Sequence, residues 1–249
     1  MSWTNQDRRI IIGISGASGA PYAVRTIELL AQRDVEVHVT ISSLGCRLLS
    51  EECGMAPVTA EALAGRGDPT RIVLHSGRDM GAVIASGSFQ HDGMIIVPCS
   101  SNTLGAIAAG MTSTLVQRAA AVTLKEGRPL LLAHRETPLS RIDIGNMDTL
   151  AGAGASIVPL SPGFYMQPRS IDDLVDFMAG RLLDRLGIEH DLPIRWKDSS
   201  EGGQVGASSM SSTVPGGGSR SSTRSPAASP PSTSTYNSLD RPSVTDVGR

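Results

Sequence analysis

Along residues 8–197, short apolar runs alternate with segments in which apolar residues recur at helical spacing. The runs have the length and β-branched content of buried strands, and "VEVHVTIS" alternates apolar and polar residues. We expect strands at 9–15, 35–42, 94–98, 130–133 and 156–160. Helical spacing predicts helices at 21–32, 115–126 and 172–186, and "CRLLSEE" is also helical in character. This alternation predicts an α/β fold in which helices cover both faces of a parallel sheet.

The composition changes sharply after Trp196. Ser, Gly, Pro and Thr dominate residues 198–249, and apolar residues are sparse, so this segment buries too little surface to offset its conformational entropy. We predict a flexible N-terminus at 1–7, one folded domain at 8–197 and a disordered tail at 198–249. A flexible extension without a function of its own is the simplest interpretation of the tail.

The composition of the whole chain excludes several classes of protein. A formal net charge of -2 over 249 residues gives no reason to expect a nucleic-acid partner. No apolar run approaches the roughly 20 residues of a membrane span, and "MSWTNQDRRI" contains no signal-peptide core. Cys46, Cys53 and Cys99 are odd in number, form no CxxC motif and fit a reducing compartment. These features favour a cytoplasmic protein.

The loop after the first strand is rich in glycine. Its glycines and hydroxyls are Gly13, Ser15, Gly16, Ser18 and Gly19. Glycine lets backbone amides approach an anion, and the following helix offers its positive end, so the turn favours a phosphate; a plain strand-to-helix turn has the same composition. Ala17 stands where a nucleophile elbow needs glycine, and Ile14 where the dinucleotide fingerprint needs one. A mononucleotide therefore fits better than a dinucleotide.

Ligands of parallel α/β sheets bind beyond the carboxyl ends of the strands, where further polar residues occur. "PCSSNTL" follows the central strand, and its Ser100–Thr103 stretch can cap a helix or bind a ribityl chain. Arg118 and Lys125 lie seven residues apart, on one helical face. Any single charge is ordinarily a solvated surface group, but an apolar strand delivers Arg135 and Glu136 to the ligand-binding edge.

Two further residues stand out near the C-terminal end of the domain. Tyr165 lies between two prolines, which restrict how its ring can point. Arg181 lies on the apolar-rich helix at 172–186, where it either pairs with an anion or extends to solvent. The five histidines are scattered without metal-ligand spacing, so we expect no metal site.

Several of these motifs resemble those of the UbiX-type flavin prenyltransferases. The motifs are "GISGASGAPYAVR", "ASGSF", "IIVPCSSNTLGAIAAG", "QRAAAVTLKEGRPLLLAHRETPL" and "NMDTLAGAGASIVPLSPGFYMQPRSIDDLVDFMAGRLLDRLGI". The match spans about residues 8–197 in the family's order and spacing. It implies a flavodoxin-like or Rossmann-like three-layer fold that binds FMN. It also implies symmetric homo-oligomers, often dodecamers, with the site at subunit junctions.

The resemblance implies a metal-independent reaction. The dimethylallyl group of dimethylallyl monophosphate is joined to N5 and C6 of reduced FMN, and the prenylated FMN serves a UbiD-type decarboxylase. The residues that match the family's flavin contacts are Gly16, Ala17, Ser18, Ser42, Ser100, Ser101, Asn102, Thr103 and Arg118. Those that match its prenyl-phosphate contacts are Lys125, Arg135, Tyr165 and Arg181, and those that match its catalytic groups are Ser18, Glu52 and Glu136. Glu52 often acts from a neighbouring subunit in the family.

One departure and two alternatives accompany the resemblance. The family often has Lys-Glu-Arg-Arg where this chain has Lys125-Glu126-Gly127-Arg128, so one positive charge is lost. We also expect Gly127 to cost helix propensity, roughly 1 kcal/mol relative to Ala. The alternatives are an FMN-binding accessory subunit of an aromatic acid decarboxylase and a flavin decarboxylase of the phosphopantothenoylcysteine type. Against the second alternative, this chain has no Pro-x-Met-Asn motif, and its histidines do not stand where that family has its catalytic histidine.

Overall fold

The computed structural model describes residues 8–33 and 35–192, which form a six-stranded parallel sheet. The strands are β1 (Arg9–Ile14), β2 (Glu36–Ile41), β3 (Ile72–Ser76), β4 (Gly93–Cys99), β5 (Leu130–His134) and β6 (Ser156–Ile157). Their order, β3-β2-β1-β4-β5-β6, is that of the Rossmann fold and confirms the predicted α/β class. The N-terminus predicted at 1–7, the tail predicted at 198–249 and the last few residues of the predicted domain lie outside the described residues.

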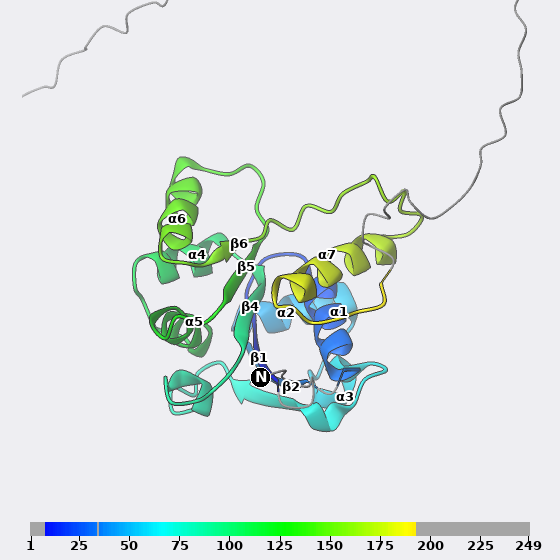
Figure 1. Cartoon of the computed structure of the whole chain (residues 1–249), viewed down its shortest axis with the longest axis horizontal. Coiled ribbons are helices and arrows are strands. Elements are labelled where there is room, and N and C mark those ends of the chain that lie inside the picture. Colours follow the sequence, from blue (N-terminus) through cyan, green and yellow to red (C-terminus); the bar gives the residue numbers. More distant parts are fainter. Residues whose placement is uncertain (1–7, 34, 193–249) are drawn as a thin grey trace, which may run out of the picture. The chain divides into compact units, whose positions relative to one another are not determined.

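Helices cover both faces of the sheet (Figure 1). They are α1 (Ala20–Ala31), α2 (Ser43–Cys53), α3 (Ala60–Ala64), α4 (Ser101–Ala108), α5 (Leu115–Lys125), α6 (Arg141–Gly152) and α7 (Ile171–Arg185). α1, α2, α3 and α7 contribute to one buried apolar cluster, and α4, α5 and α6 to another on the opposite face. The three predicted layers are therefore confirmed. No described helix is long and apolar enough to cross a membrane.

Strand β1 shows why the chain makes two cores. Ile10 and Ile12 point into the cluster under α1 and α7, whereas Ile11 points into the cluster under α4 and α5. Successive side chains of a strand alternate between the two faces, so a continuous run of isoleucine fits a strand that is buried on both. The same arrangement recurs in β4, where all seven residues are buried.

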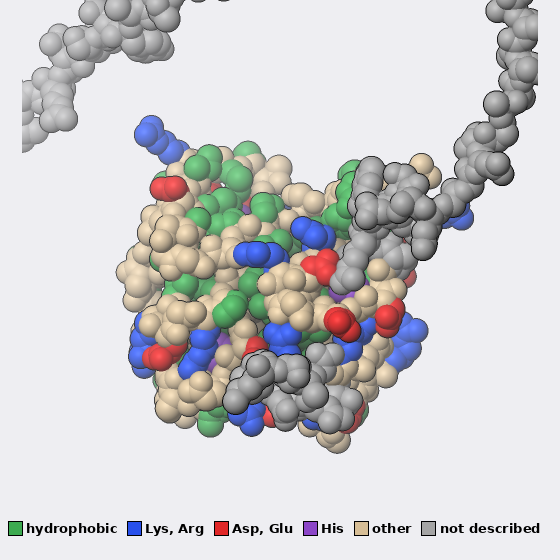
Figure 2. Space-filling model, viewed as in Figure 1, with side chains coloured by type: hydrophobic (Ala, Val, Ile, Leu, Met, Phe, Trp, Pro, Cys, Tyr) green, Lys and Arg blue, Asp and Glu red, His purple; other side chains and the backbone are tan. Residues whose placement is uncertain are grey.

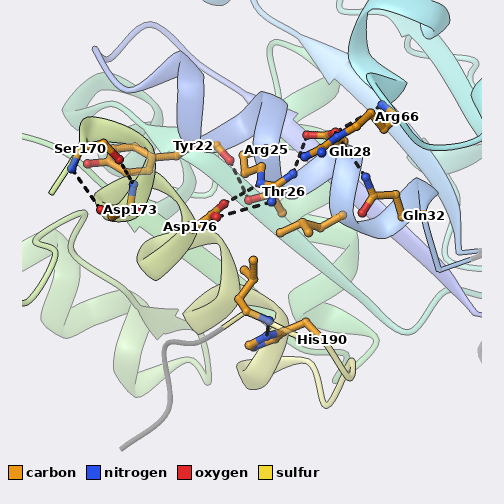
Figure 3. Close-up of polar contacts among 12 residues, drawn as sticks. Tyr22, Arg25, Thr26, Glu28, Gln32, Arg66, Ser170, Asp173, Asp176 and His190 are labelled. Carbon is orange, nitrogen blue, oxygen red and sulfur yellow. Dashed lines mark hydrogen bonds and ion pairs between the residues drawn. The ribbon is translucent and has the colours of Figure 1, made fainter. Parts of the chain in front are cut away.

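Charged side chains fasten α7 to α1 (Figure 3). Arg25 Nε lies 2.6 Å from Asp176 Oδ1 across the two helices, and Arg25 Nη1 lies 2.7 Å from Glu28 Oε2. Burial raises the pKa of Glu28, but hydrogen bonds from Arg25 and Arg66 outweigh that effect and lower it. Because both partners of the cross-helix pair are mostly buried, the pair fixes α7 against the sheet more firmly than an exposed pair would.

The structure contains elements that the periodicity did not predict. β3 is an edge strand whose apolar run is only three residues long, Ile72–Leu74, and two of the three, Val73 and Leu74, are exposed. α6 buries only Asp143 and Leu150, and Ile142 and Ile144 are exposed on it. Figure 2 shows hydrophobic side chains over this helix. A helix with so few buried positions gives no amphipathic pattern to recognise.

The prediction that Gly127 lowers the stability of a helix is wrong, because Gly127 lies beyond the end of α5. α5 ends at Lys125, and Gly127 follows it with φ 66°, in the left-handed region. Its amide donates to the carbonyl of Leu124 at 3.0 Å, and the amide of Arg128 donates to that of Thr123 at 3.0 Å. These bonds close the last turn of the helix, where glycine is the favoured residue. Gly127 therefore terminates the helix and does not weaken it.

Candidate active site

The candidate site lies where the strand order reverses, between β1 and β4. Ser15, at the end of β1, is 1% exposed, and its hydroxyl donates to the carbonyl of Pro98 at 2.9 Å. The amide of Ser100 donates back to Ser15 Oγ at 2.8 Å. These bonds tie the glycine turn to the loop after β4, and ligands bind at such a reversal in open α/β sheets. The sequence showed a hydroxyl at Ser15 but gave no sign of this bridging role.

The glycine turn packs tightly against the start of α2. A Cβ atom on Gly16 would lie 2.5 Å from Leu44 Cβ, so glycine is needed for this approach. Ala17 is buried beside it, and Ser18 is exposed at the rim.

The anion position at the start of α1 is filled by the chain itself. Glu52 Oε2 accepts hydrogen bonds from the amides of Gly19 and Ala20 at 2.9 Å and 2.8 Å. A carboxylate is favourable there because the helix N-terminus presents unpaired amides and a positive dipole end. The sequence led us to expect this end of α1 to serve a nucleotide phosphate, and two of its amides are already occupied.

Two of the predicted flavin-contacting serines cap helices. Ser42 Oγ accepts from the amide of Gly45 at 3.0 Å and caps α2, and Ser100 Oγ accepts from the amide of Thr103 at 3.3 Å and caps α4. Thr103 is buried and Asn102 exposed. The Ser101 hydroxyl is buried without a hydrogen-bond partner among the described residues. Capping directs both serine loops toward the carboxyl edge and leaves Ser101 able to bind a further group.

The structure brings three predicted residues together at the end of β5. Arg135 Nε donates to the carbonyl of Ser18 at 3.1 Å, which joins the loop after β5 to the glycine turn. Glu136 is exposed, and its Oε1 accepts from the amide of Thr137 at 3.0 Å. Arg135 and Glu136 line a cavity of about 390 Å³ with Met147 and with residues 159–161. A cation, a carboxylate and a serine thus converge on one edge of the sheet.

The "ASGSF" motif at 85–89 is held against α5 by two arginines. Arg118 Nε donates to the carbonyl of Ala85 at 3.1 Å. Arg128 donates through Nη1 to the carbonyl of Phe89 at 2.8 Å and through Nη2 to that of Gly87 at 3.0 Å. Arg118 and the "ASGSF" segment therefore form one unit, which Arg128 also holds in place; its place in the sequence did not indicate this structural role.

The predicted phosphate-binding residues do not gather within one chain. Lys125 ends α5 and pairs with Glu126 at 3.1 Å, whereas Arg181 lies on α7 and pairs with Asp184 at 3.7 Å. α5 and α7 cover opposite faces of the sheet, so these two side chains are separated by the core. Tyr165 is exposed, and its ring packs edge-on against Phe177, with the ring centres 5.8 Å apart.

Comparisons with known proteins agree on one family. The family model described as Flavoprotein matches residues 2–183. A flavin prenyltransferase UbiX from Halalkalibacterium halodurans is 42% identical over 194 residues, covering 76% of this chain and 94% of the relative. The chain belongs to the UbiX-type flavin prenyltransferases. The mitochondrial flavin prenyltransferase PAD1 of Saccharomyces cerevisiae is 44% identical over 190 residues, covering 76% of each chain.

Solved structures of this prenyltransferase family have the same fold. The crystal structure of AnUbiX in complex with FMN and dimethylallyl pyrophosphate has a TM-score of 0.70 and 40% identity, covering 77% of this chain and 98% of that one. The crystal structure of a dodecameric FMN-dependent UbiX-like decarboxylase from Escherichia coli O157:H7 has a TM-score of 0.69 and 41% identity, covering 76% of this chain and 100% of that one. This family member is a prenyltransferase and a flavoprotein that uses FMN. No group of metal-ligating side chains occurs in the described part of the chain.

Proposed function

We propose that this enzyme joins the dimethylallyl group of dimethylallyl monophosphate to N5 and C6 of reduced FMN. The observation that supports it most directly is the convergence of Ser18, Arg135 and Glu136 at the carboxyl edge of the sheet. A related structure at 40% identity was solved with FMN and a dimethylallyl ester. An FMN-binding accessory subunit would need no second set of cations for another phosphate, which favours the transferase.

The residues at the strand-order reversal fit FMN. The absence of a side chain on Gly16 lets the turn approach α2 closely, and the hydroxyl of Ser101 is buried at the start of α4. We assign FMN contacts to Gly16, Ala17, Ser18, Ser42, Ser100, Ser101, Asn102, Thr103 and Arg118. Bound reduced FMN supplies the nucleophilic nitrogen and an electron-rich ring surface. The protein holds the ring at the edge where Arg135 and Glu136 emerge, which orients it for transfer.

Cationic side chains stabilise the departing phosphate. As the ester bond breaks, negative charge grows on the phosphate oxygens, and Arg135, Lys125 and Arg181 interact with that charge more strongly than with the intact ester. Tyr165 donates a hydrogen bond to the same group. Arginine suits this role because its planar guanidinium binds phosphate through two parallel hydrogen bonds.

A complete phosphate pocket requires more than one copy of the chain. Lys125 and Arg181 lie on opposite faces of one sheet, so only different copies can bring them to the same phosphate. We therefore propose a homo-oligomer with active sites at its subunit junctions. Ile142 and Ile144 on α6, Phe164 and Ile171 are exposed apolar side chains that such contacts would bury. The related structure from Escherichia coli is dodecameric.

Glu136 and Ser18 are the groups placed to move the proton in ring closure. The Glu136 carboxylate is exposed at the edge and retains Oε2 for a proton, because only its Oε1 accepts from Thr137. A carboxylate that takes up the proton in this step acts as a general base. Glu52 reaches the other side of the glycine turn, where it orders the segment that bears Ser18.

An anaerobic assay tests the proposal. Protein mixed with reduced FMN and dimethylallyl monophosphate should yield flavin heavier by one five-carbon unit, detected by mass spectrometry. Recovery of unmodified FMN alone, under conditions that activate a known relative, would favour the accessory subunit.

The variant Glu136→Gln separates catalysis from binding. We expect the reaction to slow by about 10²-fold to 10⁴-fold, with FMN affinity preserved. Glu61→Gln on α3 is the matched control, since α3 lies at the far end of the sheet from the loops of the site (Figure 1). Equal loss of turnover and of FMN binding in Glu136→Gln would mean that Glu136 has a structural role.

We also propose that the prenylated FMN is passed to a UbiD-type decarboxylase and that the enzyme works in the cytoplasm. The described cysteines are all free thiols, as expected in a reducing compartment. Release of prenylated FMN from the purified enzyme to an apo-decarboxylase, measured by recovery of decarboxylation, tests the transfer.

A further inference from the structure

Gly163 lies two residues before Tyr165 on the loop that joins β6 to α7, and the proposed function leaves it without a role. A Cβ atom on Gly163 would lie 2.8 Å from Cε1 and 3.0 Å from Cδ1 of Tyr165, and 3.4 Å from Cζ of Phe177. The Tyr165 ring therefore packs directly against the backbone of residue 163, in space that any other side chain would occupy.

Phe177 of α7 makes a second contact with the same ring. The two rings meet edge to face, with their centres 5.8 Å apart and an angle of 83° between their planes. Phe177 is 9% exposed and belongs to the core cluster under α1 and α7, whereas Tyr165 is 54% exposed. Edge-to-face contacts favour one orientation of the rings. The core thus holds one ring in place, and that ring orients the other.

The backbone around Tyr165 is also constrained. The amide of Gln167 donates to the carbonyl of Phe164 at 2.9 Å, which closes a turn with Tyr165 and Met166 at its centre. Gln167 has φ 51°, a left-handed conformation that is rare for a residue directly before proline. Such a conformation persists where the surrounding structure fixes the chain, so the loop holds the tyrosine in one place.

The Tyr165 ring packs against α7 one turn before Arg181. Phe177 and Arg181 are four residues apart on this helix, so their side chains emerge on the same side of it. The proposed function assigns both Tyr165 and Arg181 to the phosphate of the dimethylallyl ester. Contact with Phe177 therefore brings the tyrosine to the part of α7 that carries the cation.

We propose that Gly163 is a positioning residue of the phosphate pocket, whose missing side chain gives the Tyr165 ring its place beside Phe177. This inference rests on the proposed function, since that function gives the Tyr165 hydroxyl its acceptor. A hydrogen bond weakens steeply when its geometry is lost. The size of the side chain at position 163 therefore determines how well the hydroxyl donates to the phosphate.

The variant Gly163→Ala tests the inference with a small change. Gly163 has no positive φ, so the backbone accepts alanine, and the new methyl group meets an exposed ring that can move away. We expect a urea midpoint no lower than that of the wild type and unchanged FMN affinity. The kcat/KM for dimethylallyl monophosphate should fall by about 10-fold, since small misplacements of a binding group have effects of that order. Gly152→Ala on α6 is the matched control, because its φ is not positive and nothing lies within 4 Å of its Cβ position.

A second substitution shows whether the effect passes through the tyrosine hydroxyl. Tyr165→Phe should lower kcat/KM by about 10-fold to 100-fold, the size expected for one hydrogen bond to a charged group. In the Tyr165→Phe background, Gly163→Ala should change kcat/KM by less than about twofold, because no hydroxyl is left to misplace. An equal loss in both backgrounds, or a Gly163→Ala enzyme within about twofold of the wild type, would overturn the inference. So would a parallel fall of the urea midpoint and FMN affinity in Gly163→Ala, which indicates a structural role.

A spectroscopic test needs neither substrate nor turnover. Solid-state ¹⁹F spectra of the full-length protein containing 3-fluorotyrosine report the surroundings of its three tyrosines, and the Tyr165 signal is the one absent from Tyr165→Phe. We expect Gly163→Ala to shift this signal and Gly152→Ala to leave it in place. A signal that Gly163→Ala leaves unchanged refutes the inference, even in an active enzyme. A shifted signal in a protein whose wild type has no transferase activity refutes the proposed function instead, so the two failures are distinguishable.

Discussion

Replacement of Gly127 by alanine should destabilise the protein, although glycine is a poor helix former. The residue has φ 66° after the last turn of α5, and a Cβ atom there would meet nothing within 4 Å. The cost is therefore conformational and not steric. Placing an L-residue in the left-handed region costs about 1–2 kcal/mol, and some of this is offset because alanine restricts the unfolded chain. We expect the free energy of unfolding to fall by about 1 kcal/mol.

Gly145 provides the matched control. It lies inside α6, has no positive φ, and its Cβ position is equally empty. Gly145→Ala should therefore stabilise the protein by roughly 0.5–1 kcal/mol. Urea unfolding at one protein concentration, without FMN, measures both variants. Equal stabilisation by the two substitutions would refute the reasoning, because it would mean that residue 127 tolerates or prefers a helical conformation.

The remaining predictions test the α1–α7 contact and the core. Asp176→Asn should lower the free energy of unfolding by roughly 1–2 kcal/mol, because it removes the charged partner of the mostly buried Arg25. Arg47→Met, which breaks an exposed pair, should leave the free energy of unfolding close to that of the wild type. Similar effects of the two substitutions in urea titrations would contradict this. Burial raises the pKa of the Cys99 thiol from about 9 to about 12, so folded stability should decline as the pH rises between those values. At pH 8 iodoacetamide should label the exposed Cys46 and not Cys99, and native labelling of Cys99 would show that the core opens.

Periodicity predicted the inner strands because burial on both faces requires continuous apolar runs. β1 and β4 have such runs, and both were expected close to where they occur. The edge strand β3 was missed because its apolar run has only three residues. Helix α6 was missed because it buries only two of its residues, so its apolar residues form no single buried face. Helix α5 was predicted one residue too long, since the expectation ended at 126 and the helix ends at Lys125.

The residues of the candidate site were accessible to sequence reasoning only in part. Loops after strands were the right place to look, and Arg135 does contact Ser18 there. Pairing across loops cannot be derived from spacing, so neither the Ser15 bridge nor the hydrogen bonds from the start of α1 to Glu52 were foreseen. The family resemblance supplied the residues of the phosphate pocket, but not the fact that they occur on opposite sides of one sheet.

The separation of α5 and α7 means that a defective subunit would lower the activity of its neighbours in an assembly. Each copy would contribute one cation to the phosphate pocket of a neighbour and receive another from a neighbour in its own pocket. A defective copy that still assembles would therefore inactivate pockets in intact copies. In an assembly that mixes wild-type and defective subunits, activity would then decline faster than the fraction of wild-type subunits.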